Sequence, residues 1–83
     1  MPTTRISISS TVWTPVSVAA SGFMENQGPS IVMYRTAAAV PAANDNMGHA
    51  LGFEKSVGWS RATAETIYAK TVSGTATLIV TEG

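Results

Sequence analysis

The sequence predicts an all-β fold: one small antiparallel β-sandwich or barrel of about seven short strands, ending in a C-terminal hairpin. The chain holds eight Val, five Ile and eleven Thr but only two Leu, and β-branched side chains suit a pleated sheet. Alternating apolar and polar residues recur in short runs roughly 8–12 residues apart, a spacing typical of small sandwiches and barrels. The 83 residues are enough for one domain, residues 1–83, and not for two.

The first strand pattern covers residues 5–9, where two isoleucines alternate with serines, and it follows a short N-terminal arm of about residues 1–5. A second alternating run covers residues 12–19. Pro15 interrupts this run, and proline cannot donate a ladder hydrogen bond. We therefore expect the second strand to be broken at Pro15 or to lie at a sheet edge.

Turn residues then separate two further extended pieces. We expect a turn over residues 20–22, a short extended piece over 23–25, and a second turn at Asn26-Gln-Gly-Pro29, which is a strong turn signal. Residues 30–36 alternate apolar side chains on both faces, and they form the strongest candidate for a central strand.

The segment 36–47 is rich in Ala and is interrupted by Pro41, so it suits neither a long helix nor a strand. We expect an extended, exposed loop here, with at most one helical turn, and a candidate contact surface. Residues 48–53 and 55–58 read as short strands kinked at glycines, and residues 59–64 link them to the C-terminal hairpin.

The hairpin prediction includes a register. Taking Ser73 and Gly74 as the two turn residues pairs Val72 with Thr75, Ala69 with Leu78, and Ile67 with Val80. Directly opposed residues share a face, so the last two pairs form one apolar face. Lys70 then lies on the opposite, mixed face, where its replacement by Ala is expected to cost on the order of 0.5 kcal/mol or less.

The composition limits the classes of function that we expect for this chain. The net charge is zero, with five basic and five acidic residues scattered singly, which does not provide the basic stripe that nucleic-acid binding needs. No run approaches the roughly 20 apolar residues of a membrane helix, and we expect a soluble protein. The chain has no Cys, so it has no disulfide to reinforce a modest core. This favours support from partner subunits, hence a homo-oligomer.

The candidate chemical motifs are weak. His49 is the only His, and no nucleophile-elbow motif accompanies it, so we interpret it as a locally hydrogen-bonded side chain. Asn44, Asp45 and Asn46 are consecutive, whereas a calcium loop alternates its ligands; a turn is the better interpretation. We expect no enzyme activity, no metal and no cofactor.

The aromatic residues leave one alternative open. Trp13, Trp59, Tyr34 and Tyr68 are most simply core or subunit-interface residues, since each buries a large area. A sugar-binding site that uses Trp59 and Tyr34 as stacking platforms is the alternative hypothesis.

Several segments together resemble small virion proteins of tailed bacteriophages: residues 10–13, 31–35, 39–43, 49–51, 67–71 and 74–82. Such chains can end in a segment similar to Tyr-Ala-Arg…Ser-Gly-Thr-Ala-x-Leu-x-Val-Thr-Glu. Lys70 stands in the place of that Arg here, a mild departure.

The resemblance implies a non-enzymatic structural protein of the virion, made in the host cytoplasm. The first hypothesis is a capsid decoration, or cement, protein that bridges capsid subunits as a homo-oligomer, with a trimer favoured. Its partner would be the major capsid protein or another virion protein. The alternative is a tail- or fibre-associated structural or host-glycan-binding module. The predicted protein contacts are Pro2, Thr3, Thr4, Arg5, Val40, Pro41, Asn44, Asp45 and Asn46.

Overall fold

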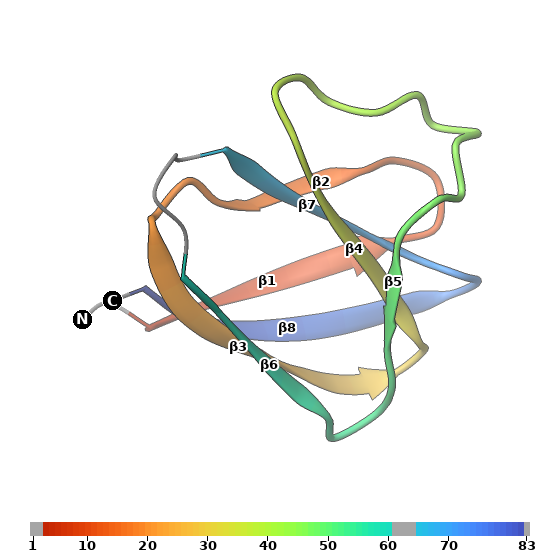
Figure 1. The fold of residues 1–83 in the computed structure, drawn as a ribbon. Helices are drawn as coiled ribbons and strands as arrows, with labels where there is room; N and C mark the ends of the chain where they lie inside the picture. The colour runs from red at the N-terminus through yellow and green to blue at the C-terminus, as the bar shows by residue number, and fades with distance from the viewer. Residues whose placement is uncertain (1–2, 61–64, 83) are drawn as a thin grey trace.

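The computed structural model describes residues 3–60 and 65–82 and contains only strands as regular structure in them (Figure 1). This confirms the all-β prediction, with eight strands where about seven were expected. The strands are β1 (Thr3–Ser9), β2 (Thr14–Ser17), β3 (Ser21–Pro29), β4 (Val32–Ala37), β5 (His49–Leu51), β6 (Ser56–Ser60), β7 (Thr66–Thr71) and β8 (Thr75–Glu82).

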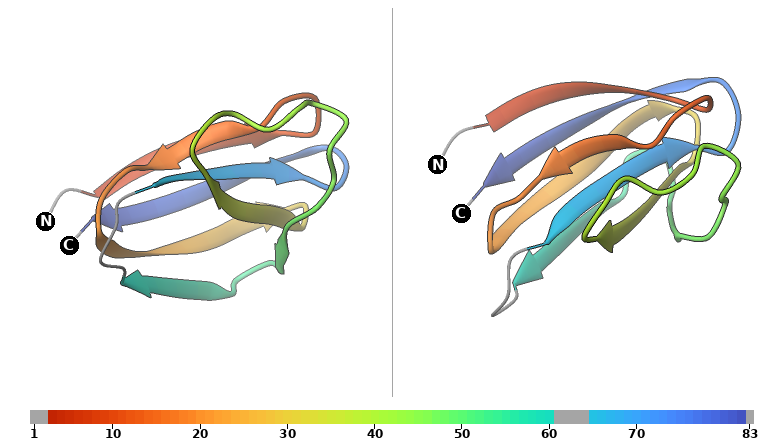
Figure 2. Two further views of the ribbon diagram at one scale, coloured as in Figure 1. Left: turned by 45° about the horizontal axis from the view of Figure 1, so that its top comes forward. Right: turned by 90° about the horizontal axis from the view of Figure 1, so that it is seen from above.

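The strands form two four-stranded antiparallel sheets that pack face to face (Figure 2). The first sheet has the order β1-β8-β3-β6 and the second has the order β2-β7-β4-β5. Every connection crosses from one sheet to the other except the one between β4 and β5. The result is a sandwich in which consecutive strands other than β4 and β5 lie in different layers.

The core lies between the sheets and is built from alternate residues of both. The first sheet contributes Ile8, Met24, Ala76, Leu78 and Val80, and the second contributes Val16, Val32, Leu51, Ile67 and Ala69. This alternation is what a strand with one buried face requires.

The predicted pairing of the C-terminal hairpin is wrong. β7 pairs with β2 and β4, whereas β8 pairs with β1 and β3, so the two strands cross between sheets instead of pairing. The face assignment is right, because Ile67, Ala69, Leu78 and Val80 are all buried. Two strands joined by a short turn show the same alternation whether they share a sheet or face each other across a core. The alternation therefore predicts which face of each strand is buried, but not which strand it pairs with.

Two local predictions also change. The expected turn at residues 26–29 is an irregularity inside β3, where the register with β8 shifts between Asn26 and Pro29 and Gly28 has a φ of 77°. The expected arm is also absent from the described residues, because Thr3, Thr4 and Arg5 form the start of β1 and pair with β8.

The edge prediction for the second strand is confirmed. β2 is an edge strand of the second sheet, and its register with β7 shifts between Pro15 and Ser17. The loop predicted over residues 36–47 begins two residues later, because Thr36 and Ala37 belong to β4. Residues 38–48 contain a turn but no helix and are mostly exposed, as expected.

Candidate functional site

One end of the sandwich presents a large exposed hydrophobic side chain from each of four connections. Val12 lies between β1 and β2, Ile31 between β3 and β4, Phe53 between β5 and β6, and Val72 between β7 and β8. Their exposed fractions are 48%, 50%, 55% and 60%, respectively. The strand registers bring these four connections to the same end of the molecule (Figure 1). We call this group of four residues the apolar tip.

A fully buried asparagine fixes the backbone beneath the apolar tip. Asn26 is 0% exposed, and its side-chain amide donates to the carbonyl oxygens of Ser30, at 2.9 Å, and Leu51, at 2.8 Å. Its side-chain oxygen accepts the N–H of Gly28 at 2.7 Å. Its backbone N–H and C=O bond to the turn at residues 54–55. Asn26 thus joins two of the four connections that carry the tip, the β3–β4 and the β5–β6 connections.

Further hydrogen bonds fix the β7–β8 connection and tie it to the β3–β4 connection. The N–H of Val72 donates to the carbonyl oxygen of Ile31 at 3.1 Å, and the Thr71 hydroxyl donates to the carbonyl oxygen of Gly74 at 2.7 Å. The Phe53 ring lies so close to the backbone at Gly28 that a β-carbon there would collide with it. The connections that carry Ile31, Phe53 and Val72 are therefore preorganised, and binding through them would lose little loop entropy.

A second feature is the loop at residues 38–48, which folds over the outside of the second sheet. Asp45 holds it there. Its carboxylate accepts from the Arg35 guanidinium at 2.9 Å and from the Met47 N–H at 3.0 Å, and its carbonyl oxygen accepts the indole N–H of Trp13 at 2.8 Å. The Arg35 guanidinium also lies 5.7 Å from the Trp13 ring centroid, within the range of a cation–π contact.

The surroundings of Asp45 support the turn interpretation of the Asn-Asp-Asn run. The N–H of Asp45 donates to the Ala42 carbonyl oxygen at 2.9 Å. The Met47 N–H and then the Arg35 guanidinium hold the pKa of Asp45 below its usual value, because both stabilise the charged carboxylate. Among the described residues no group of three or more His, Cys, Asp and Glu side chains gathers as a metal site would need.

Lys70 lies on the outer face of β7, as predicted, but this face is covered and Lys70 is not exposed to solvent. The side chain is 5% exposed, and its ammonium donates to the Ala43 carbonyl oxygen at 2.6 Å and to the Asn46 side-chain oxygen at 2.7 Å. Both acceptors belong to the loop at residues 38–48, which covers the outer face of β7. Trp13 is buried under the same loop. This explains why nearly all of β7 is buried, although its strand pattern has only one core-facing side.

Lys70→Ala is accordingly expected to destabilise the protein by about 1–3 kcal/mol, because it removes two hydrogen bonds from a charged donor at a buried position. Urea unfolding measures the change. The control is Lys55→Ala, since Lys55 is exposed in the β5–β6 turn and its loss should cost less than about 0.5 kcal/mol. Equal effects of the two substitutions would contradict the buried role of Lys70.

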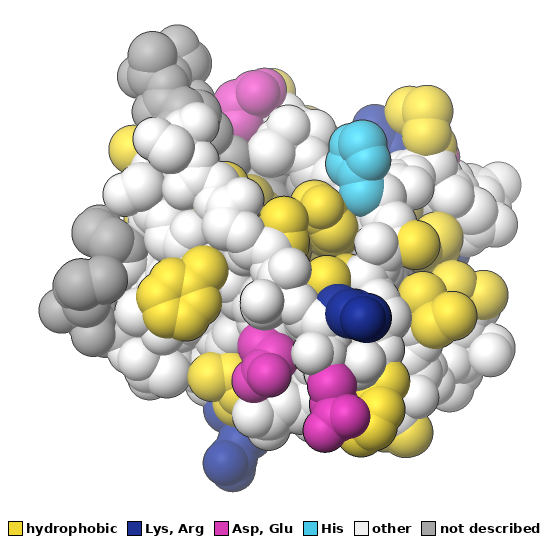
Figure 3. All heavy atoms as spheres, turned by 60° about the horizontal axis from the view of Figure 1, so that its bottom comes forward, with side chains coloured by type: hydrophobic (Ala, Val, Ile, Leu, Met, Phe, Trp, Pro, Cys, Tyr) yellow, Lys and Arg dark blue, Asp and Glu magenta, His cyan; other side chains and the backbone are white. Residues whose placement is uncertain are grey.

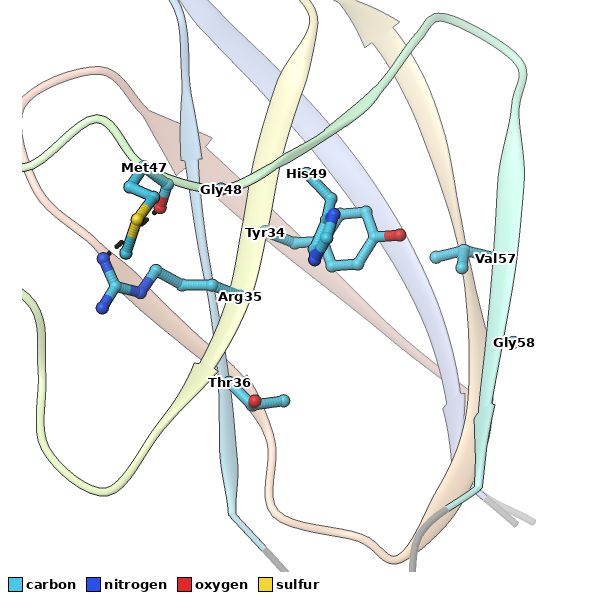
Figure 4. A pocket seen from close by; sticks show the side chains of 8 residues that line it. All are labelled: Tyr34, Arg35, Thr36, Met47, Gly48, His49, Val57 and Gly58. Carbon is cyan, nitrogen blue, oxygen red and sulfur yellow. Dashed lines mark hydrogen bonds between the residues drawn. The ribbon is translucent and has the colours of Figure 1, made fainter.

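A hollow of about 600 Å³ opens between the two sheets on the side of β5 and β6. It is lined by Tyr34, Arg35, Thr36, Met47, Gly48, His49, Val57 and Gly58. In Figure 4 the Tyr34 ring points across the gap toward Val57, with the His49 ring beside it; the two ring centroids lie 5.4 Å apart at 40°. This volume falls in the range of small-molecule sites.

The two aromatic residues of the alternative sugar site do not share this hollow. Tyr34 lines it, whereas Trp59 does not. Trp59 lies on β6 in the other sheet, its indole N–H donates to the Ala19 carbonyl oxygen at 3.1 Å, and its ring covers Gly22. Only Tyr34 of the predicted pair is thus placed to contact a molecule in the hollow.

The predicted protein contacts fall in two separate places. Thr3, Thr4 and Arg5 are exposed on β1 of the first sheet, and Pro2 lies outside the described residues. The loop over the second sheet carries the other predicted contacts: Val40, Asn44 and Asn46 are exposed, and Pro41 and Asp45 are half-buried.

Sequence reasoning missed the apolar tip. The available signal was a large hydrophobic residue beside turn residues, as in Gly52-Phe53-Glu54 and Val72-Ser73-Gly74.

Comparisons with protein-family models, with curated proteins and with solved structures found no match. In the described part of the chain no helix is long and apolar enough to cross a membrane.

Figure 3 shows one face on which hydrophobic side chains lie among polar atoms, with acidic and basic side chains as close neighbours. The charges on that face are therefore of mixed sign and form neither an acidic nor a basic patch.

Proposed function

We propose that this chain is a non-enzymatic structural protein of a bacteriophage virion, a capsid decoration protein that docks onto the major capsid protein through the apolar tip. The observation that carries the proposal is the tip itself: four half-exposed hydrophobic side chains, one from each connection at one end, on a hydrogen-bonded frame. The virion setting and the capsid partner come from the sequence resemblance.

The physical case rests on how small interfaces gain affinity. A few large side chains that fill pockets on the partner supply most of the binding free energy, and a rigid presentation reduces the entropy cost. Each copy has room for only a modest interface on a body of 31 × 26 × 17 Å. Many copies on one shell can still stabilise it together.

Val72→Asp should lower binding to capsids that lack the protein by at least about tenfold, because a charge at the tip would have to be desolvated on docking. Co-sedimentation of purified protein with such capsids measures the affinity. The matched control is Val18→Asp: Val18 is 65% exposed, against 60% for Val72, and lies at the opposite end, between β2 and β3. Equal losses from both variants would rule out the tip as the docking surface.

A second candidate is a tail- or fibre-associated module that binds a host glycan. The hollow beside Tyr34 favours it, because an aromatic ring at the wall of an open cavity can stack on a sugar ring. A glycan array separates the two functions. Specific binding of one glycan with no binding to capsids would support the second function, and the reverse result would support the first.

A further inference from the structure

The sandwich has four edge strands, and three of them are protected against pairing with another chain. β2 carries Pro15 and a register shift, β5 has only 3 residues, and β6 has 5 residues with Gly58 at its centre. Short strands, proline and irregular pairing are the usual means of blocking an open edge.

β1 has none of these features. It is 7 residues long, contains no proline or glycine, and pairs with β8 in an unbroken register from Thr3 to Ser9. Its one charged side chain is Arg5. The strand lies along one border of the molecule, with no further strand of its sheet beyond it (Figure 2). A long regular edge with unpaired backbone groups is a template for another strand.

We infer that β1 pairs antiparallel with β1 of a second copy about a twofold axis at Ile6, which joins the two first sheets into one sheet of eight strands. The inference is independent of the proposed virion function. A second copy fits because its β1 has the same length and the same alternation, with Ile6 and Ile8 toward the core and Arg5 and Ser7 exposed.

The register follows from faces and charge. Directly opposed residues of an antiparallel pair share a face of the sheet. Core-facing residues of one copy must therefore lie opposite core-facing residues of the other, which restricts the possible registers to those that pair odd-numbered with odd-numbered residues. Centring the pair on Ile6 opposes Thr3 with Ser9 and Arg5 with Ser7, and it uses all seven residues. Centring it on Arg5 would set two arginines directly opposite each other, which is unfavourable.

This register gives a charge test at one position. Ser7 faces solvent beside Thr77, and in the dimer it lies opposite the partner's Arg5. Arg5 forms no salt bridge with any residue that the structure describes. Ser7→Glu creates two opposite-charge pairs per dimer, and Ser7→Lys creates two like-charge pairs.

Sedimentation velocity over a concentration series measures the association of the full chain. We expect a dimer of about 17 kDa, twice the 8.6 kDa chain. Relative to the unmodified protein, Ser7→Glu should tighten dimerisation about threefold to tenfold and Ser7→Lys should weaken it by a similar factor. Circular dichroism checks that both variants keep the strand spectrum of the unmodified protein.

Addition of salt should reduce the difference between the two variants, because exposed ion pairs are screened. A protein that stays monomeric up to millimolar concentration would overturn the inference. A trimer, which the resemblance to decoration proteins implies, would also overturn it, as would a dimer that responds equally to both substitutions. None of these outcomes bears on whether the apolar tip binds capsids.

Discussion

Leu78→Asp is expected to abolish folding. Leu78 is 0% exposed at the centre of β8, and β8 pairs with both β1 and β3. A carboxylate there has no partner in an apolar core, and its burial costs several kcal/mol. A domain of this size has roughly 5 kcal/mol of stability, so the substitution should remove all of it. Circular dichroism should show an unfolded chain at neutral pH.

The matched control is the neighbouring position on the same strand. Thr77 faces outward from the first sheet and is only half-buried, so Thr77→Asp should cost less than about 1 kcal/mol. A folded Leu78→Asp variant, or equal destabilisation at the two positions, would mean that the inner and outer faces of β8 have been assigned wrongly.

Asn26→Leu is expected to destabilise the protein by at least about 3 kcal/mol. The substitution keeps the volume but removes every hydrogen bond of the side-chain amide. The carbonyl oxygens of Ser30 and Leu51 and the N–H of Gly28 then lose their partner, and each buried group left unpaired costs about 1–3 kcal/mol. Urea unfolding measures the loss.

The effect should also reach the tip. Amide hydrogen exchange should show faster opening of residues 28–31 and 51–55, because Asn26 joins these two segments. The control is Gln27→Ala, since the Gln27 side chain is exposed and, among the described residues, bonds only to Glu25, at 3.3 Å. Its loss should cost no more than about 0.5 kcal/mol. Unchanged exchange in Asn26→Leu would contradict the role of Asn26 as the support of the tip.

Much of the fold could be predicted from residue patterns because each strand has one apolar face. The alternation around Ile6 and Ile8 and in the last two strands identified residues that the structure buries. The break at Pro15 followed from its missing N–H. The partner of each strand could not be predicted, since alternation is the same for a hairpin and for a crossing between sheets. The β7–β8 connection crosses between the two sheets.

The burial of polar residues was the other gap. Lys70 and Asn26 sit in sequence contexts that suggest a solvated face and a turn, yet both are almost completely buried. Each is accommodated by acceptors from segments distant in sequence, residues 43–46 for Lys70 and residue 51 for Asn26. Local propensity carries no information about such partners.

The apolar tip is a product of topology as well. Val12, Ile31, Phe53 and Val72 are spread over 61 positions of the chain, and the reversal of chain direction from each strand to the next brings their four connections to one end. A single exposed hydrophobic residue in a turn needs no explanation. Four at one end, on a fixed frame, suggest an interaction site.

The two proposals are compatible in space. Antiparallel pairing of β1 strands about Ile6 points the two copies in opposite directions along the strands, so the apolar tips lie at opposite ends of the dimer. Neither tip takes part in the β1 contact.

Cryo-electron microscopy of the intact particle that contains this chain would show whether the protein docks onto the capsid through the apolar tip. We expect regular density for the sandwich on the capsid surface, with residues 12, 31, 53 and 72 against the major capsid protein. Density confined to the tail or a fibre would contradict the decoration function. Copies on the capsid with the apolar tip facing solvent, or no copies on the particle at all, would contradict the docking mode or the virion assignment itself.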